Sequence, residues 1–457
     1  MASVSKREWL VLIIGDVAAF TAALWLTLFL RHVTSPTLDT FLQHLSPFSF
    51  LFLVWIAIFV IAGLYGRHST LFKSELPNTV ITAQAVNIVV AALFFSFIPS
   101  FGIAPKTVLA IYVVISSLLI ISWRLYLFDL LGNGKRQKAA IIGSGKELHE
   151  LVDEVNKNHR YRLEFVHVVD LAKVQNPNDI AQDILKRVVR GDITTLVANT
   201  RGKQLDTLMP LFYNLSFVQS QVQVVDFGKL YEEAFERVPL SLVSYDWLIE
   251  NGENEPRFFY SSMKRIIDLF FSILLFCIFV VLLPVIYIAV LIDDHGKLFI
   301  HQERMGKDGK HITVMKLRTM TSNEQGAWIG ETKNKVTRIG SFLRLTSIDE
   351  LPQIFTVLSG KLSFIGPRSD VVGLAERLGE AIPFYNARYK VVPGISGWAQ
   401  INQRYAPGKI SPQSIEESRV RLAYDLYYVK HRSVTLDFVI ALRTLKTLLG
   451  RFVKIFI

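Results

Sequence analysis

Cysteine is nearly absent from this chain, which has Cys277 alone among its 457 residues. A single thiol cannot form an intramolecular disulfide, so the sequence excludes a cross-linked fold and favours a reducing compartment. Cys277 also lies inside a long apolar run. A cysteine nucleophile is therefore not expected.

Charged residues are scarce as well, at 19%, whereas hydrophobic residues reach 51% and the mean hydropathy is +0.34. This composition excludes an ordinary soluble enzyme and indicates a membrane protein in contact with a lipid bilayer. The 50 Lys and Arg residues outnumber the 39 Asp and Glu residues, which fits anionic lipid headgroups or phosphorylated substrates. Nucleic-acid binding is not predicted, because the basic residues lie beside apolar segments and form no recognised motif.

Four apolar segments precede residue 135. A cleavable signal peptide is not evident, since the first segment is longer than a signal core and lacks a small-residue cleavage site. Each segment approaches the length needed to cross ~30 Å of hydrocarbon, and the second is the shortest. The segments are Trp9–Leu30, Phe48–Leu64, Val80–Ile98 and Val108–Trp123. Residues 1–134 are therefore predicted to form a four-helix transmembrane region, which could anchor the protein or form a homodimer.

The charges of the loops predict the orientation of these spans. One side offers mainly Arg31 and Lys106. The opposite side is more basic and carries Lys6, Arg7, Arg67, Lys73, Lys135, Arg136 and Lys138. The positive-inside rule then places the amino terminus in the cytoplasm, and four spans return the chain to the cytoplasm.

Residues 135–250 read as a Rossmann-like parallel α/β domain. Apolar strand-like runs near 139–143, 165–170, 194–199 and 221–226 alternate with helical patterns. Gly143 and Gly145 follow the first run, and Asp170 ends the second, as in a dinucleotide-binding unit. Leu148, however, occupies the position of the third glycine of that fingerprint. We therefore expect a regulatory or scaffolding domain with no bound cofactor.

A fifth apolar run, Ile266–Ile292, is interrupted only by Pro284. Its length allows it to span the membrane as one helix. Alternatively, Pro284 removes one amide and disfavours helix at Leu283, which would suit a re-entrant hairpin. A nucleotide-dependent reaction downstream would favour re-entry, because activated sugar nucleotides are cytoplasmic.

The stretch SIDELPQ places Asp349 and Glu350 side by side ahead of Pro352. Acidic residues suit the first turn of a helix, so one interpretation is helix capping. The other is catalysis, because a carboxylate can attack phosphorus and divide one displacement into two. The surrounding sequence is needed to decide between them.

That sequence resembles the bacterial sugar transferase family, the monotopic phosphoglycosyltransferases, over about residues 260–457. Five ordered motifs carry the resemblance: K-x-R-T-M at 316–320, G-x-x-L-R at 340–344, D-E-L-P-Q at 349–353, G-P-R at 366–368 and P-G-x-x-G-W-A-Q at 393–400. The spans and the Rossmann-like domain ahead of them resemble the long polyprenyl-phosphate hexose-1-phosphate transferase branch. Ser369 and Ser396 depart from the usual proline and threonine, without removing a charge.

The resemblance implies a reaction and its partners. A hexose-1-phosphate would pass from a UDP-hexose to undecaprenyl phosphate through an aspartyl-phosphosugar intermediate, with release of UMP, as the initiating step of polysaccharide synthesis. It also implies that Asp349 is the nucleophile, that Glu350 supports metal and phosphate, and that Pro367-Arg368 contacts the nucleotide. The segment 266–292 would re-enter the bacterial inner membrane, which keeps a small mixed α/β catalytic domain in the cytoplasm.

The residues themselves explain why such a site needs cations. An anionic nucleophile approaching a diphosphate requires neutralisation by Mg²⁺ and by fixed charges. The candidates are Lys316, Arg318, Arg344 and Arg368. Lys316 and Arg318 alternate along a strand-like run and would share one face, although Lys316 or Arg344 could instead be solvated. Mg²⁺ would be held by Glu350 and Asp349, and Gln353, one turn further on, would share their face or merely pack.

Two other functions remain open from the sequence. A membrane-bound nucleotide-sugar dehydratase would need Tyr-x-x-x-Lys on a helix, but the match at Tyr405–Lys409 encloses Pro407 and Gly408. A non-enzymatic scaffold or sensor of polysaccharide assembly would leave Asp349 dispensable. The basic, apolar segment from Leu436 suits either an interfacial helix or a core helix.

Overall fold

The computed structural model describes residues 6–65, 76–97, 105–127, 136–158, 161, 163–173, 177–200, 203–219, 222–252, 257–294, 297–320, 336–405 and 411–456. Three cations that predicted the orientation, Arg67, Lys73 and Lys135, lie outside these residues, as does Lys409. The chain divides into two compact units, Met1–Ala234 and Phe235–Ile457. The sequence-based boundary at residue 250 stays a prediction, although Val238 and Val243 pack in the core of the second unit.

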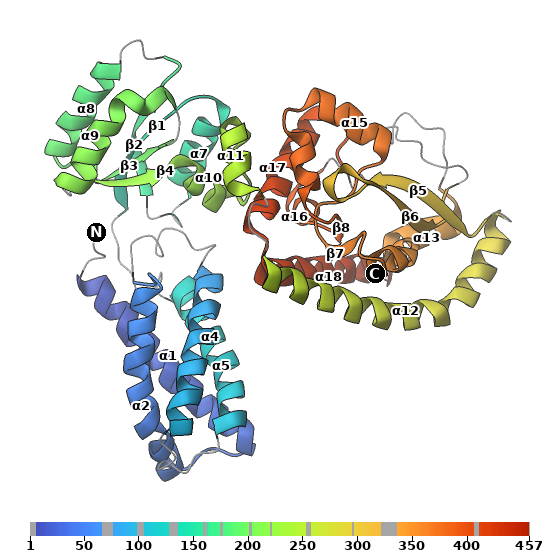
Figure 1. The fold of residues 1–457 in the computed structure, drawn as a ribbon, viewed down its shortest axis with the longest axis horizontal. Coiled ribbons are helices and arrows are strands. Elements are labelled where there is room, and N and C mark those ends of the chain that lie inside the picture. The colour runs from blue at the N-terminus through green and yellow to red at the C-terminus, as the bar shows by residue number, and fades with distance from the viewer. Residues whose placement is uncertain are drawn as a thin grey trace. The chain divides into compact units, whose positions relative to one another are not determined.

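Four long apolar helices form the first part of unit one (Figure 1). They are α1 (Lys6–His32), α2 (Leu38–Ile61), α4 (Leu76–Phe97) and α5 (Pro105–Ser122), and α5 continues into the π-helical turn η2 (Trp123–Leu127). Each helix packs against two others around an aromatic core that includes Phe20, Phe48 and Trp55. By length and composition, all four could span a membrane. The second begins at Leu38, ten residues before the predicted start, because Thr37 caps it and Pro47 is accommodated within it.

The bundle also encloses a charged cluster that hydropathy alone did not reveal. Arg124 Nε and Nη2 donate to the two carboxylate oxygens of Asp16 at 3.1 and 2.5 Å, and the Tyr65 hydroxyl donates to Asp16 at 2.6 Å. The Asp16 and Arg124 side chains are only 0% and 2% exposed. Pairing is what allows both charges to remain inside an apolar bundle.

The remainder of unit one is a parallel four-stranded sheet in the order β2-β1-β3-β4. The strands are β1 (Gln137–Gly143), β2 (Leu163–Asp170), β3 (Thr195–Ala198) and β4 (Gln223–Asp226). The helices are α7 (Lys146–Lys157), α8 (Pro177–Val189), α9 (Met209–Tyr213) and α10 (Phe227–Phe235), with short turns η3 (Lys203–Leu208) and η4 (Asn214–Val218). All four strands lie at the predicted runs, and the parallel α/β class is confirmed.

The glycine loop of this domain departs from a dinucleotide site as the sequence indicated. Gly145 adopts a φ of 85°, which favours glycine, but Leu148 is fully buried in place of the third glycine. At the end of β2, Asp170 lies 3.6 Å from His149 Nε2 and 3.8 Å from Lys173 Nζ. The regulatory role of this domain stays a prediction.

Unit two contains two small sheets and the long helix α12 (Phe258–Asp294). An antiparallel hairpin joins β5 (Phe299–Met305) to β6 (His311–Leu317) through the turn η6 (Lys307–Gly309), and β7 (Ser363–Ile365) pairs in parallel with β8 (Gly394–Ser396). The helices are η5 (Leu240–Leu242), α11 (Tyr245–Asn251), α13 (Arg338–Thr346), η8 (Ile348–Gln353), α14 (Ile354–Leu358), α15 (Val372–Ala381), η9 (Tyr385–Lys390), α16 (Trp398–Asn402), α17 (Ile415–His431) and α18 (Val434–Phe456).

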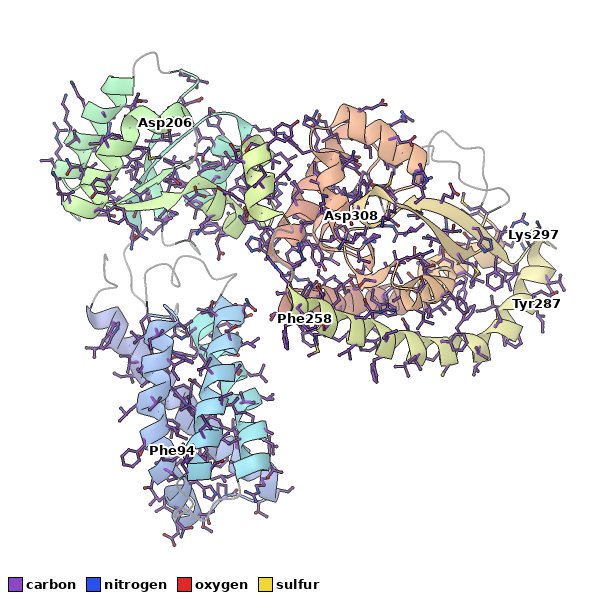
Figure 2. The ribbon with its side chains drawn as sticks, in the orientation of Figure 1. Phe94, Asp206, Phe258, Tyr287, Lys297 and Asp308 are labelled. Atoms are coloured by element: carbon purple, nitrogen blue, oxygen red, sulfur yellow. The ribbon has the colours of Figure 1, made fainter. Side chains whose placement is uncertain are left out.

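Helix α12 continues through Pro284, so of the two alternatives that the sequence left open, the one with a break at Leu283 is wrong. Figure 1 shows the helix curving toward its C-terminal end, and Figure 2 labels Phe258 at its start and Tyr287 on the curved part. A helix can bend at a proline without ending there, because only one backbone hydrogen bond is lost. The inner face packs Ile286 and Val290 against Leu317 and Leu343.

The outer face of α12 is apolar and exposed. Its exposed side chains include Ile266, Phe270, Ile273, Val281, Val285, Ile288 and Ile292, each more than half exposed. Exposure of so many apolar side chains to water is unfavourable, and such a surface usually contacts a membrane or another protein. The segment from Leu436 was predicted to form either an interfacial helix or a core helix, and α18 has features of both. Ile440 is fully buried, whereas Phe438, Leu442, Leu445 and Leu449 are half exposed or more.

Candidate active site

The acidic pair lies in a short 3-10 helix, η8, in unit two. Helix α13 stops at Ser347, which adopts the left-handed conformation with φ 58° and so turns the chain before Ile348. Asp349 and Glu350 then occupy the first turn of η8, and Pro352 fits because few amides of that turn need a partner. The capping interpretation therefore describes their local position correctly. It does not account for what surrounds them.

Two cations converge on Glu350 from other elements. Lys316 Nζ of β6 lies 3.0 Å from Glu350 Oε1, and Arg368 Nη2, from the loop after β7, lies 2.6 Å from the same oxygen. Burial alone would raise the pKa of Glu350, but Arg368 and Lys316 hold it well below its ordinary range. Glu350 is therefore ionised at neutral pH and keeps both cations in place.

Asp349 is in the opposite situation, although it is the adjacent residue. Its side chain is buried, and among the described residues it makes no hydrogen bond or ion pair. Burial and the neighbouring charge of Glu350 raise the pKa of Asp349 to about 6, against the weaker effects of Lys316, Arg344 and Arg368. Adjacent carboxylates with pKa values moved apart indicate two different tasks.

With Asp349 as the predicted nucleophile, we expect the activity of this site to fall in acid, because only an ionised carboxylate could attack phosphorus. With a pKa of about 6, kcat/KM should decrease about tenfold per pH unit below that value. At the alkaline end, burial lowers the pKa of Lys316, so its charge is lost at a lower pH than that of an ordinary lysine. The measurement is kcat/KM between pH 4 and 10 at constant ionic strength. A profile that stays level down to the ordinary aspartate pKa would contradict this role for Asp349.

Of the remaining predicted residues, some lie near the acidic pair and one does not contact it. Arg344, on α13, is half-buried and close enough to lower the pKa of Asp349. Gln353 is buried at the end of η8, and its Nε2 has no hydrogen-bond partner among the described residues. Arg318 was expected to share a face with Lys316, but it follows the end of β6 and its Nε donates to the Met320 carbonyl at 3.1 Å. The two cations that contact Glu350 are Lys316 and Arg368.

The loop that carries Arg368 is built from glycines at close approach. The Gly366 amide donates to the Ser396 carbonyl and the Gly394 amide to the Pro367 carbonyl, both at 2.9 Å. A Cβ on Gly366 would lie 2.6 Å from the Val392 carbonyl oxygen, so a side chain there would separate the two segments. Pro367 is buried, and Arg368 Nη1 donates to the Ile395 carbonyl at 3.2 Å. The Arg368 guanidinium is therefore held by Ile395 through Nη1 and by Glu350 through Nη2.

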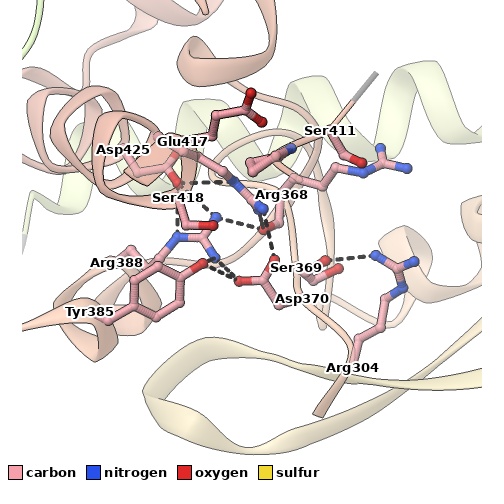
Figure 3. A network of polar contacts seen from close by, with 12 residues as sticks. Arg304, Arg368, Ser369, Asp370, Tyr385, Arg388, Ser411, Glu417, Ser418 and Asp425 are labelled. Atoms are coloured by element: carbon pink, nitrogen blue, oxygen red, sulfur yellow. Dashed lines mark hydrogen bonds and ion pairs between the residues drawn. The ribbon is translucent and has the colours of Figure 1, made fainter. Parts of the chain in front are cut away.

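A second buried network holds the backbone of the same loop at Arg368 (Figure 3). Arg388 and Arg421 donate to the main-chain carbonyl of Arg368 at 2.8 and 2.6 Å. Both also pair with Asp370, which accepts hydrogen bonds from the hydroxyls of Tyr385 and Tyr389 at 2.8 Å. Although burial would raise the pKa of Asp370, the two arginines hold it well below its ordinary range.

Comparison with known proteins decides the family. Residues 259–451 match the family model described as bacterial sugar transferase. The chain is 36% identical over 197 residues to a UDP-glucose:undecaprenyl-phosphate glucose-1-phosphate transferase of Caulobacter vibrioides, covering 42% of this chain and 72% of that protein.

This chain belongs to the bacterial sugar transferase family.

Two further relatives are longer than the matched region. The chain is 34% identical over 215 residues to an Aeromonas hydrophila UDP-N-acetylgalactosamine-undecaprenyl-phosphate N-acetylgalactosaminephosphotransferase, covering 46% of this chain and 49% of that protein. It is 41% identical over 177 residues to a Klebsiella pneumoniae UDP-glucose:undecaprenyl-phosphate glucose-1-phosphate transferase, covering 38% and 37%. The chain thus spans half or less of the length of these two relatives.

Mg²⁺ is compatible with this bacterial sugar transferase site only if the substrate completes its coordination. Among the described residues, no group of three or more His, Cys, Asp or Glu side chains could hold a metal. Lys316 and Arg368 both contact Oε1 of Glu350, and no described residue bonds to Oε2. Glu350 Oε2 and the Asp349 carboxylate are therefore the available ligands, and Mg²⁺ commonly uses one or two carboxylates together with substrate phosphates.

The sequence did not indicate the buried ion-pair network that holds the main-chain carbonyl of Arg368. Asp370, Arg388, Arg421 and Asp425 come from the loop after β7, from η9 and from α17, and their pairing is visible only once these elements pack. One signal was available in α17, where Arg421 and Asp425 stand four residues apart, each followed by an apolar residue, Leu422 or Leu426. A charged pair on a buried helical face indicates a partner elsewhere in the fold.

Proposed function

We propose that this protein transfers a hexose-1-phosphate from a UDP-hexose to undecaprenyl phosphate and releases UMP. The observation that carries the proposal is the contrast within one dipeptide, an unpaired Asp349 with a raised pKa beside a Glu350 that binds two cations. The names of the Caulobacter and Klebsiella relatives describe the same reaction for glucose. This reaction would initiate a polysaccharide.

In the first step, a carboxylate oxygen of Asp349 would bond to the phosphorus that carries the sugar. The bond from that phosphorus to the bridging oxygen breaks, and UMP leaves with that oxygen and its electron pair. An oxygen of undecaprenyl phosphate then attacks the same phosphorus, and Asp349 leaves as a carboxylate. Division of the transfer into two displacements makes a covalent aspartyl-phosphosugar the central intermediate.

The neighbouring residues stabilise the charge that gathers around this phosphorus. Arg368 and Lys316 are already fixed by Glu350, so they need little rearrangement when the diphosphate arrives. Arg344 lies in the last turn of α13, and Gln353 Nε2, which has no partner among the described residues, could donate to a phosphate or sugar oxygen. Mg²⁺ held by Glu350 and Asp349 would neutralise part of the diphosphate charge.

The direct test is a transfer assay with full-length protein in proteoliposomes. Undecaprenyl phosphate, Mg²⁺ and a panel of radiolabelled UDP-hexoses would be supplied, including UDP-glucose and UDP-N-acetylgalactosamine. We expect one sugar to appear in the lipid fraction with an equal amount of UMP. If no UDP-hexose is turned over, the alternative of a non-enzymatic scaffold of polysaccharide assembly is favoured.

We also propose that α12 enters and leaves the inner membrane on the cytoplasmic side, so the catalytic domain is cytoplasmic. Its exposed apolar outer face supports burial in lipid, and its curvature past Pro284 suits re-entry. A homodimer through the four N-terminal spans stays a prediction.

This topology predicts which engineered cysteines an impermeant thiol reagent can reach in intact cells. The background is Cys277→Ser, since Cys277 is exposed on α12. Lys310→Cys, in the β5–β6 turn, should be protected, whereas Ser35→Cys, in the exposed loop between α1 and α2, should react. Both should react after the cells are permeabilised. Labelling of Lys310→Cys in intact cells would show that α12 crosses the membrane.

A further inference from the structure

The segment 235–252, here called the strap, follows the end of α10. It precedes the region that the family model matches, which begins at residue 259, yet its contacts place it in unit two. Val238 and Val243 are buried in a hydrophobic cluster of that unit, and Trp247 packs against the same cluster. The Val238 amide also donates to the Ala423 carbonyl at 3.1 Å. The strap is therefore part of the unit that carries the candidate active site.

The beginning of the strap holds the indole of Trp398, which is only 3% exposed. Trp398 Nε1 donates to the Glu236 carbonyl at 2.8 Å, and the Arg443 guanidinium lies over the Trp398 ring, 5.0 Å from its centroid. Glu236 adopts a φ of 53°. This backbone conformation is unfavourable for a residue with a Cβ, and it persists only where the surrounding contacts fix it. The Glu236 carbonyl is therefore a fixed acceptor for the indole.

Trp398 is tied in turn to the loop that carries Arg368. The residue before Trp398 is a glycine, where a Cβ would lie only 2.4 Å from the Gly366 carbonyl oxygen. The Ile395 carbonyl accepts hydrogen bonds from Arg368 Nη1 at 3.2 Å and from Gln400 Nε2 of α16 at 3.3 Å. Because segments packed this closely move together, a displacement of Trp398 would also displace the carbonyl that holds Arg368.

We propose that the strap positions Arg368 through Trp398. Glu236 fixes the indole, the indole fixes the beginning of α16, and the end of β8 then holds the Arg368 guanidinium beside Glu350. Trp398 is thus a positioning residue and not a catalytic one, since it acts through Arg368. The expected kinetic effect rests on the proposed function, in which Arg368 stabilises the phosphate charge, whereas the expected effect on the loop does not.

Trp398→Phe tests this inference, because it removes the indole N–H and keeps an aromatic ring. In the full chain in proteoliposomes, we expect KM for the UDP-hexose to rise about fivefold, the equivalent of one hydrogen bond, while kcat changes less than about twofold. Trp247→Phe is the matched control. Trp247 packs against the same hydrophobic cluster, and its indole N–H makes no hydrogen bond to the residues that the structure describes. This control should leave KM unchanged.

Hydrogen–deuterium exchange of the same proteins gives a readout that does not depend on turnover. The amides of Gly366 and Gly394 make the hydrogen bonds that join the Arg368 loop to β8, so their exchange reports on this contact. Both amides should exchange about fivefold faster in Trp398→Phe than in the parent. In Trp247→Phe they should exchange at the rate of the parent.

A second pair of variants alters the strap and leaves Trp398 unchanged. Proline fixes φ near about −65°, so Glu236→Pro should displace the carbonyl and reproduce the changes seen in Trp398→Phe. Glu236→Gly removes the same carboxylate, whose exposed ion pair with Arg443 contributes little, but glycine readily adopts a positive φ. Glu236→Gly should therefore behave as the parent. This pair also decides the inference if Trp398→Phe does not fold.

Three results would overturn the inference. The first is a Trp398→Phe protein with unchanged KM and unchanged exchange. Equal effects in Trp398→Phe and Trp247→Phe would indicate a general loosening of the core. Equal effects in Glu236→Pro and Glu236→Gly would show that the carboxylate matters and the backbone conformation does not. If the parent turns over no UDP-hexose, the proposed function fails, and the exchange rates alone decide the inference.

Discussion

Replacing Asp349 with asparagine is expected to reduce kcat for sugar transfer by about 10⁴-fold or more, because the amide cannot form the bond to phosphorus. The substitution preserves the size of the side chain in a buried position. Transfer from the radiolabelled UDP-hexose to lipid in proteoliposomes measures the effect. Asp308→Asn, an exposed carboxylate on the η6 turn with a distant partner at 3.7 Å, is the matched control and should retain activity.

The same substitution should make the protein more stable, which separates lost chemistry from lost folding. Since the folded state raises the pKa of Asp349 from 3.8 to about 6, its charged form costs stability above pH 6. The cost disappears as the pH falls below the unfolded value. Asp349→Asn should therefore gain on the order of 2 kcal/mol at pH 7.5, and nothing near pH 3.5, when metal is removed with EDTA. Retained activity, or a large loss of stability at neutral pH, would contradict the assignment.

Replacing Asp370 with asparagine is expected to destabilise unit two by about 3 to 5 kcal/mol, because it leaves buried arginines without their shared carboxylate. The side chains of Arg388 and Arg421 are 0% and 8% exposed, so water cannot replace the lost partner. Asp425 remains beside Arg388, but burial raises its own pKa and its Oδ1 has no partner among the described residues. Denaturation of the purified protein in detergent measures the change.

Activity of the surviving folded fraction is the second readout for Asp370→Asn. Both arginines donate to the Arg368 carbonyl, so a loosened loop should raise KM for the UDP-hexose more than it lowers kcat. Glu416→Gln is the control, since it breaks an exposed pair with Arg419 on α17 and should change neither stability nor activity. An Asp370→Asn protein as stable as the parent would show that the network contributes little.

Much of the fold was predictable because local patterns agree with the tertiary structure. The strands β1 to β4 lie on apolar runs bounded by polar turns, and the four N-terminal helices coincide with the hydropathic segments. The differences concern two helices. Helix α2 begins ten residues before the predicted segment, and α12 continues through Pro284, where one of the two alternatives placed an interruption. Tertiary packing outweighed the local cost of a missing amide.

The candidate site was predictable in its members but not in its electrostatics. Motif order brought Lys316, Asp349, Glu350 and Arg368 to attention, although 52 positions separate the first from the last. The sequence could not show that both cations contact Glu350 and leave Asp349 unpaired, since this depends on the orientation of η8 against β6. Likewise, Arg318 alternates with Lys316 but lies past the end of the strand.

The central claim, a covalent bond between Asp349 and the transferred phosphosugar, is tested most directly by trapping the enzyme during the reaction. The full chain would be mixed with its UDP-hexose and Mg²⁺ in the absence of undecaprenyl phosphate, quenched in acid and digested for mass spectrometry. The peptide containing Asp349 should gain the mass of one hexose phosphate, and the gain should disappear when undecaprenyl phosphate is added. Normal turnover with an unmodified Asp349 peptide, or an adduct on another side chain, would contradict the account.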